Sequence, residues 1–304
     1  MKFLIYGGRG WIGQQVINEL QKQNHEVIIG ESRLEQREHI LNEIQKYKPD
    51  RIINCAGKTG NPNVDWCEDH KEETIRNNVL GLINLIDCAF INNIHILNWG
   101  TGCIFEYDDE HEMNSGIGFT ENDKPNFDKS FYSKTKGLVE QIIKYYPNML
   151  NLRLRMPIGD DLHPRNFITK IVNYEKVVNI PNSMSVLYDL IPISIDMSIT
   201  KKTGIINFTN PGTISHNEIL DLYKKYIDPF FEYTNFTLEE QSKILKAGRS
   251  NNELDSSKLL EWYPQIPHIK DSIKNVFKRM RYNLGLDLIP LNLNNDLISK
   301  LNQI

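Results

Sequence analysis

The stretch Gly7-Gly8-Arg9-Gly10-Trp11-Ile12-Gly13 lies between an apolar strand expected over residues 2–6 and a helix expected over residues 11–23. Glycines in such a turn let the backbone approach a pyrophosphate at the positive N-terminal end of the helix. The spacing G-x-x-G-x-x-G differs from the G-x-G-x-x-G of many dehydrogenases, although the physical basis is shared. A purely structural turn is the alternative, but the strand–turn–helix context favours a dinucleotide site. Its predicted members in this stretch are Gly7, Arg9, Gly10, Trp11, Ile12 and Gly13.

Strand patterns alternate with helix patterns through the first half of the chain. Apolar strands are expected over 26–29, 51–55, 94–99 and 150–155, and helices over 34–47, 72–90 and 133–145. Near-continuous apolar strands joined by helices are typical of a parallel sheet that is covered on both faces. Because such crossovers are right-handed, the sequence predicts an α/β fold with a doubly wound parallel sheet of the Rossmann type.

The pattern changes beyond Pro157. Shorter elements follow, among them a strand over 204–209 and two helices that begin with capping boxes, Ser215-x-x-Glu218 and Thr237-x-x-Glu240. We therefore expect three parts in the chain: a dinucleotide-binding domain over residues 1–158, a smaller substrate-binding domain over 159–282 and a C-terminal tail over 283–304.

The composition is that of a globular protein. Of 304 residues, 40% are hydrophobic and 24% charged, the mean hydropathy is −0.44 and the net charge is −4. These values exclude a disordered chain, and no apolar run reaches the ~18–20 residues of a membrane helix. The weak net charge provides no field for nucleic acid or an acidic membrane. The four cysteines lack zinc spacing and no secretory signal is visible, so we expect free thiols, no metal and a cytoplasmic location.

The end of the second strand is expected to select the cofactor. A carboxylate there, Glu31, would bind the ribose hydroxyls of NAD, whereas Arg33 would pair with the 2′-phosphate of NADP. Arg9 can reach the same phosphate, so two guanidinium groups against one carboxylate favour NADP(H). A solvated surface charge is the alternative for Arg33. At the end of the third strand, the small residues Ala56 and Gly57 permit close passage of the cofactor.

A tyrosine and a lysine at helical spacing suggest acid–base chemistry. Tyr132 and Lys136 lie at i and i+4, on one face of the helix that we expect there. Free tyrosine has a pKa near ~10, and a lysine ammonium one turn away favours the phenolate. Thr101 follows the fourth strand, at the sheet edge where doubly wound folds bind ligands. Its hydroxyl can bind a substrate carbonyl oxygen together with Tyr132.

The glycine stretch, Thr101 and Tyr132-x-x-x-Lys136, in this order, resemble the extended short-chain dehydrogenase/reductase superfamily. Further motifs resemble one branch of it, the nucleotide-rhamnose synthases, which are UDP-4-keto-6-deoxyglucose 3,5-epimerase/4-reductases. The resemblance covers residues 2–275. Its motifs are NVDWCE (63–68), TGCIFEYD (101–108), NSGIGF (114–119), SFYSKTK (130–136), RMPI (155–158), PRNFITKI (164–171), IPNSM (180–184), NFTNPG (207–212) and RSNNELD (249–255).

This resemblance implies a two-stage reaction. In a 4-keto sugar the C–H bonds at C3 and C5 are acidic, and Thr101 and Tyr132 would stabilise the enolate oxygen as an oxyanion hole does. Inversion needs a base on one face and an acid on the other, and the resemblance assigns these roles to Cys103 and Lys170. A nicotinamide would then deliver hydride to C4, with Tyr132 supplying the proton and Lys136 holding the ribose.

The resemblance also implies contacts with the nucleotide and with a partner. Arg249 matches the arginine that binds the diphosphate in extended reductases, and Asn166 is a second candidate for substrate binding. The helix over 133–145 is the expected interface of a homodimer. The resemblance assigns no role to His163 or Lys58.

Three functions remain open from the sequence: the bifunctional epimerase/reductase, a reductase that acts only on a pre-epimerised dTDP- or UDP-4-keto-rhamnose, and a non-catalytic NADP-binding regulatory subunit. Cys103 and Lys170 favour the first, although the thiol alone fits a packed strand end and the lysine a surface charge. A surface ion pair is the alternative for Arg249. A 4,6-dehydratase is disfavoured because Thr101-Gly102-Cys103 supplies no carboxylates. The sequence does not distinguish a UDP from a dTDP carrier.

Overall fold

Six parallel strands form the central sheet of the protein, whose computed structural model describes residues 1–286. The strand order is β2-β1-β3-β4-β5-β9, and every neighbouring pair is parallel. The doubly wound parallel sheet predicted from the sequence is confirmed. The strands are β1 (Lys2–Tyr6), β2 (Glu26–Ile29), β3 (Arg51–Asn54), β4 (His95–Trp99), β5 (Met149–Arg153) and β9 (Gly204–Asn207).

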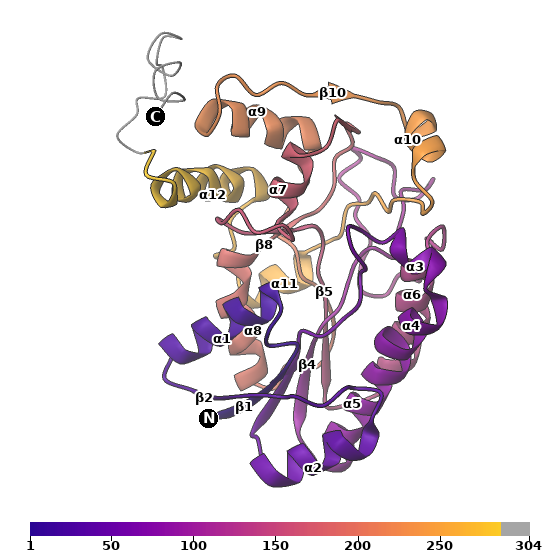
Figure 1. Cartoon of the computed structure of the whole chain (residues 1–304), viewed down its shortest axis with the longest axis vertical. Helices are drawn as coiled ribbons and strands as arrows, with labels where there is room; N and C mark the ends of the chain where they lie inside the picture. Colours follow the sequence, from indigo (N-terminus) through magenta and orange to yellow (C-terminus); the bar gives the residue numbers. More distant parts are fainter. Residues whose placement is uncertain (287–304) are drawn as a thin grey trace.

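Helices cover both faces of this sheet (Figure 1). Successive side chains of β1 alternate between two hydrophobic clusters, as a strand buried on both faces requires: Phe3 and Ile5 join one, Leu4 and Tyr6 the other. The first cluster includes residues of α1 (Trp11–Lys22), α8 (Leu187–Ile199) and α11 (Ser257–Trp262). The second includes residues of α2 (Arg37–Tyr47), α5 (Gly81–Ile91) and α6 (Phe131–Ile143).

The single helix expected over 72–90 is instead interrupted by a π-helical turn. After α3 (Trp66–Asp69), the chain runs through α4 (Lys71–Ile75) and the π-turn η1 (Arg76–Leu80) into α5. Such turns re-aim a side chain without breaking a helix. Here Asn78 points back to the chain after β3, where its side chain accepts from the Lys58 N–H (2.8 Å) and donates to the Lys58 carbonyl (2.7 Å).

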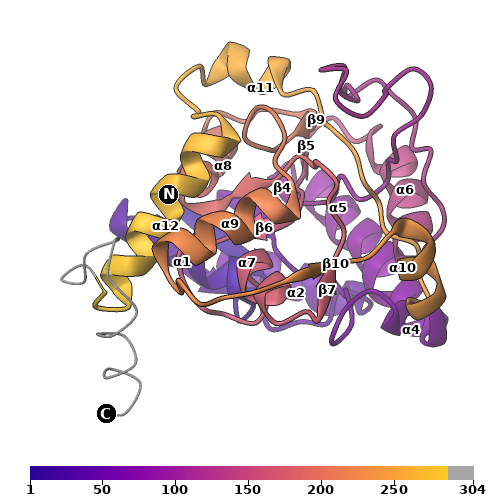
Figure 2. The same ribbon diagram turned by 90° about the horizontal axis from the view of Figure 1, so that it is seen from above.

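A second lobe lies beyond the carboxyl ends of the sheet strands (Figures 1 and 2). It has its own hydrophobic core, in which Ile168, Ile219 and Phe277 are fully buried. Both predicted capping boxes are present, at the N-termini of α9 and α10. The elements of this lobe are β6 (Pro157–Ile158), α7 (Phe167–Val172), β7 (Lys176–Val177), β8 (Ser185–Val186), α9 (His216–Tyr226), β10 (Thr234–Asn235), α10 (Leu238–Ile244) and α12 (Ile269–Asn283).

The chain passes between the two lobes more than once. After the second lobe begins, α8, β9 and α11 return to the sheet and its first hydrophobic cluster. The expected boundary after residue 158 therefore marks only the first crossing. Most of the expected tail, from residue 287 onward, lies outside the described residues. Within residues 1–286, no helix combines the length and the apolar character that a bilayer-spanning segment needs.

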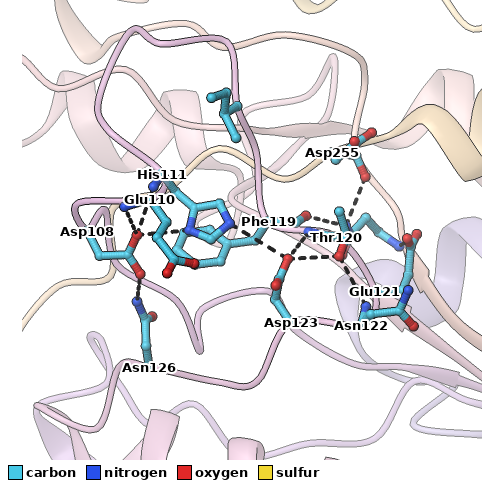
Figure 3. A network of polar contacts seen from close by, with 12 residues as sticks. Asp108, Glu110, His111, Phe119, Thr120, Glu121, Asn122, Asp123, Asn126 and Asp255 are labelled. Atoms are coloured by element: carbon cyan, nitrogen blue, oxygen red, sulfur yellow. Dashed lines mark hydrogen bonds and ion pairs between the residues drawn. The ribbon is translucent and has the colours of Figure 1, made fainter.

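The long loop between β4 and α6, residues 101–130, is fastened to the second lobe (Figure 3). The Phe119 N–H donates to the Glu253 carbonyl and its carbonyl accepts from the Asp255 N–H, both at 2.8 Å. The His111 ring stacks on Phe119, with ring centroids 3.8 Å apart. Nδ1 of His111 lies 2.8 Å from Asp108. The backbone bonds of Phe119 hold the 101–130 loop, which carries Thr101 and Cys103, against the segment 249–255, and the His111 contacts brace the loop internally.

Buried polar side chains form a ladder across the sheet. Asn54 donates to Asn98 (2.8 Å), Asn98 to Asn151 (2.7 Å) and Asn151 to Glu140 on α6 (2.9 Å). Glu140 also forms an ion pair of 2.8 Å with Arg153, and both side chains are almost completely buried. The ladder ties α6, which carries the predicted tyrosine and lysine, to the centre of the sheet.

We expect Glu140→Ala to lower the free energy of unfolding by about 3–5 kcal/mol, because it leaves the Arg153 guanidinium buried without its carboxylate. Urea denaturation followed by circular dichroism measures this change. Glu239→Ala is the matched control: that carboxylate is 79% exposed in its pair with Lys243, and its loss should cost no more than about 0.5 kcal/mol. Equal losses in the two variants would contradict the stabilising role of the buried pair.

Candidate active site

The glycine stretch forms a cradle in which two positions exclude any side chain. Gly7 has a φ of +75°, and a Cβ there would lie 2.4 Å from the Ala56 nitrogen. A Cβ on Gly13 would lie 2.3 Å from the Gly7 carbonyl oxygen. Helix α1 starts directly after Gly10 with no side-chain cap and no acidic residue in its first turn. This uncapped N-terminus and the bare backbone around it fit the pyrophosphate of a dinucleotide.

The residues predicted to read the ribose lie on the surface beyond β2. Arg9 and Glu31 form an ion pair of 3.3 Å, with side chains 82% and 73% exposed. Arg33 is exposed two residues further along. An exposed pair of this kind is weak, so a phosphate can readily replace the carboxylate as the partner of Arg9.

Helix α6 presents Tyr132 to the carboxyl edge of the sheet. The Ser130 hydroxyl caps the helix by accepting from the Ser133 N–H (3.0 Å), which fixes Tyr132 in the first turn. Burial raises the pKa of Tyr132, the nearby Cys103 raises it further, and a hydrogen bond with Thr101 lowers it. Tyr132 and Thr101, which were predicted to bind one substrate oxygen together, thus lie next to each other.

The pKa of Tyr132 differs from the sequence-based expectation. A neighbouring ammonium was expected to favour the phenolate, but burial dominates and the pKa of Tyr132 lies above its ordinary value. Tyr132 therefore keeps its proton at neutral pH. Burial lowers the pKa of Lys136 to about 8, against an opposing effect of the Glu140 carboxylate. The lysine thus titrates close to neutral pH.

Cys103 lies close enough to Lys170 to influence its pKa. Cys103 is half-buried, and its N–H donates to the Thr101 hydroxyl at 3.0 Å. The pKa of Lys170, in the last turn of α7, is lowered by burial and by Arg165 and raised by Cys103. Because Cys103 also acts on the pKa of Tyr132, it lies close to both of the other predicted groups.

Three further residues adjoin these groups, and none of them was assigned a catalytic role from the sequence. Arg155 donates to the Cys103 sulfur (3.3 Å), and its only signal was its place in the motif R-M-P-I. Arg165 raises the positive potential at Lys170. Cys67, fully buried on α3, acts on the pKa of Tyr132. None of these contacts follows from spacing along the chain.

The two predicted substrate contacts have different surroundings. Arg249 donates through Nη1 to the Asp65 carboxylate (2.8 Å) and to the Ala247 carbonyl (2.7 Å), so its charge is already paired. The Asn166 side chain is completely buried; it caps α7 and donates to the carbonyls of Gly159 and Asp161. The prediction that Asn166 contacts the nucleotide directly is wrong, because both ends of its amide are bonded to backbone. Asn166 instead shapes the loop before α7.

That loop closes on the glycine cradle. The Trp11 ring stacks on His163, with centroids 5.5 Å apart and planes 8° apart, and its Nε1–H donates to Asp161 at 2.7 Å. Arg165 donates to Thr59 (2.9 Å) and to the Gly60 carbonyl in the chain after β3. These contacts join the second lobe to the first directly above the cradle.

Lys58, in the chain after β3, pairs with Glu73 (3.1 Å). Its ammonium also lies 4.7 Å from the centroid of the Trp66 ring. Both contacts direct the side chain toward α3 and α4, the helices that flank the start of α6.

Comparison with known proteins agrees with this arrangement. The family model "NAD dependent epimerase/dehydratase family" matches residues 3–190. A bifunctional dTDP-4-dehydrorhamnose 3,5-epimerase/dTDP-4-dehydrorhamnose reductase of Arabidopsis thaliana is 55% identical over 278 residues, covering 91% of this chain and 92% of that protein. The crystal structure of a UDP-rhamnose synthase from Acanthamoeba polyphaga mimivirus has a TM-score of 0.89 at 42% identity, covering 92% of this chain and 99% of that one.

A longer relative is also similar. The trifunctional UDP-glucose 4,6-dehydratase/UDP-4-keto-6-deoxy-D-glucose 3,5-epimerase/UDP-4-keto-L-rhamnose-reductase of Arabidopsis thaliana is 56% identical over 274 residues. The match takes in 90% of this chain but spans only 41% of that protein. Together these matches confirm the family resemblance that the sequence motifs indicated.

Proposed function

Because the chain belongs to the NAD dependent epimerase/dehydratase family, we propose that it converts UDP-4-keto-6-deoxy-D-glucose to UDP-L-rhamnose as a 3,5-epimerase and 4-reductase, with NADPH as hydride donor. One observation supports both activities above all: Cys103 adjoins Thr101, whose hydroxyl accepts from the Cys103 N–H (3.0 Å), and lies close enough to Tyr132 and Lys170 to influence the pKa of each. A reductase alone needs Tyr132 and Lys136 but neither the thiol nor the second lysine.

Epimerisation uses the polar groups at the carboxyl edge of the sheet. Thr101 and Tyr132 bind the C4 oxygen and stabilise the negative charge that develops there when a proton leaves C3 or C5. Cys103 and Lys170 serve as base and acid on opposite faces of the sugar ring. Lys170 is suited to the task because burial and Arg165 lower its pKa toward neutrality.

Reduction follows in the same pocket. NADPH bound at the glycine cradle would supply the hydride for C4. Tyr132, which keeps its proton in this site, donates it to the C4 oxygen. Lys136, one turn along α6, holds the ribose and supports the tyrosine with its charge. Arg249 contributes a guanidinium for the nucleotide diphosphate when Asp65 gives way to it.

The titration of Lys136 predicts how reduction depends on pH. The ammonium is present below pH about 8 and is lost as the pH rises through that value. We therefore expect kcat/KM for NADPH, which reports groups of the free enzyme, to fall on the alkaline side of about 8. A pH profile of kcat/KM with UDP-4-keto-rhamnose as substrate measures this alkaline decrease. In Lys136→Arg, which keeps its charge, the decrease should vanish. An unchanged decrease in that variant would assign it to another group.

Arg33 carries the proposed preference for NADPH. Arg33→Ala should weaken NADPH binding about 10- to 100-fold by removing charge-assisted hydrogen bonds to the 2′-phosphate, and leave NADH binding unchanged. Fluorescence titration with both cofactors measures the effect. The control Glu31→Gln should not weaken NADPH binding, since it only releases Arg9 from its ion pair. An Arg33→Ala variant with the wild-type preference would contradict this assignment.

We also propose that the chain is a cytoplasmic homodimer, paired through α6. That helix and the turn after it expose Leu138 (60%), Ile142 (44%) and Tyr145 (80%), which form apolar surface of the kind that association covers. Light scattering during gel filtration tests the dimer, and Leu138→Glu should shift it to monomer if this face is the interface.

The proposed function is tested by NMR analysis of the product formed from UDP-4-keto-6-deoxyglucose and NADPH. UDP-L-rhamnose is the expected product. A chain that reduces only pre-epimerised UDP- or dTDP-4-keto-rhamnose would be a reductase, and one that binds NADPH without turning over any keto sugar would be a regulatory subunit. Parallel assays with UDP and dTDP sugars identify the carrier.

A further inference from the structure

Arg155 carries a buried positive charge that has no acidic partner among residues 1–286. Its side chain is completely buried, and no carboxylate within residues 1–286 forms an ion pair with it. Its Nε–H has no hydrogen-bond partner among those residues. Its acceptors are the Cys103 sulfur (3.3 Å), the Ser250 hydroxyl (2.9 Å), the Ser250 carbonyl (3.1 Å) and the Asn182 amide oxygen. Burying an unpaired charge is costly, so natural proteins rarely retain one without a use.

A neighbouring arginine is buried together with an acidic partner. Arg153, two residues earlier on β5, is equally buried but is paired with the Glu140 carboxylate at 2.8 Å. Among the described residues, a carboxylate therefore neutralises Arg153 but not Arg155. The two arginines also differ in their contact with the candidate site, because Arg155 donates to the Cys103 sulfur and Arg153 does not.

Among the acceptors of Arg155, only the thiol ionises in the ordinary pH range. We infer that Arg155 is a positioning residue: its guanidinium fixes the sulfur of Cys103 toward the pocket and stabilises that sulfur as a thiolate. An N–H···S⁻ hydrogen bond from a charged donor is stronger than one between neutral groups. The role of the thiolate in epimerisation rests on the function proposed above.

The thiolate completes a balanced proton transfer. As the C–H bond at C3 or C5 breaks, an S–H bond forms on Cys103 and the electron pair moves to the C4 oxygen. On the opposite face, an N–H bond of the Lys170 ammonium breaks as the new C–H bond forms. Exchange with water then returns the proton from the thiol to the amine.

The second lobe holds Arg155 in place. The Ser250 hydroxyl that accepts from Arg155 donates to the Phe105 carbonyl (2.6 Å). The Asn182 oxygen also accepts from the Asn252 N–H (3.0 Å). Arg155 is therefore fixed by segments of the second lobe while it acts on a sulfur of the first.

Alkylation of Cys103 by iodoacetamide at pH 7, resolved by mass spectrometry, tests the inference without any substrate. Arg155→Gln should slow it about 10- to 100-fold, the range for losing a hydrogen bond to a charged group, and Arg155→Lys should restore most of the rate. The control Arg51→Gln removes another buried guanidinium, which donates to the Ser198 and Ile199 carbonyls and not to a thiol; it should lower the melting temperature while leaving the alkylation rate near that of wild type. An unchanged rate in Arg155→Gln would overturn the inference.

A second measurement guards against a variant that does not fold. The difference in absorbance at 240 nm between the wild type and Cys103→Ser at pH 7 should show a thiolate band, and its absence would overturn the inference. These readouts are separate from the proposed function. If both hold but no rhamnose is formed, the proposed function fails and the role of Arg155 stands. If rhamnose is formed but neither effect is seen, only the role of Arg155 fails.

Discussion

Cys103→Ser should lose epimerisation by about 10²- to 10⁴-fold and keep its reductase activity. The loss is the usual contribution of a positioned acid–base group, and a serine hydroxyl is far too weak an acid at neutral pH to replace a thiol. Reduction needs Thr101, Tyr132 and Lys136, and the Cys103 contact to Thr101 is made by its backbone N–H, which serine preserves.

Two assays separate the activities in this variant. Exchange of the C3 and C5 protons of UDP-4-keto-6-deoxyglucose in D₂O reports epimerisation, and loss of NADPH absorbance with UDP-4-keto-rhamnose reports reduction. Cys88→Ser, at a buried thiol on α5 in the hydrophobic cluster beneath the sheet, is the matched control and should retain both. Full conversion of the unepimerised sugar by Cys103→Ser would remove the thiol from the mechanism.

Tyr132→Phe should impair both activities. Without the phenol the C4 oxygen loses its proton donor, which should lower the rate of reduction about 10²- to 10⁴-fold. It also loses one of two hydrogen-bond donors in the oxyanion hole, so proton exchange at C3 and C5 should fall about 10²- to 10³-fold. The variant should bind NADPH normally, because Lys136 and the glycine cradle are intact.

The loss of both activities distinguishes Tyr132→Phe from Cys103→Ser, which should lose epimerisation alone. Both assays are run on Tyr132→Phe, and cofactor binding is followed by fluorescence. Tyr145→Phe, at a side chain 80% exposed just after the same helix, is the control and should match the wild type. Reduction at the wild-type rate in Tyr132→Phe would show that another group protonates the C4 oxygen.

Much of the fold followed from local patterns. The strands are short apolar runs in the sequence, so β1 and β2 were located to the residue. The π-turn at Arg76–Leu80 was not predictable from the local pattern; its residue Asn78 contacts Lys58, twenty residues away in the sequence. The return of α8, β9 and α11 to the first lobe was also missed, since sequence order suggests contiguous domains.

At the site, residue types were easier to predict than electrostatics. Tyr132, Thr101 and Cys103 were found from motifs, and the structure brings them together. The direction of the Tyr132 pKa shift was wrong because burial outweighs a neighbouring charge and is invisible in the sequence. Asn166 was misassigned for a related reason: an asparagine before a helix is as suited to a cap as to a ligand, and here it caps α7.

The central claim is that one pocket inverts two stereocentres and then reduces the ketone between them. Conversion of UDP-4-keto-6-deoxyglucose by the wild-type chain in D₂O with ordinary NADPH tests it most directly, with the product analysed by NMR. The account predicts UDP-L-rhamnose that carries deuterium at both C3 and C5 and protium at C4. A reduced sugar without deuterium at C3 and C5, or no reduced sugar at all, would contradict it.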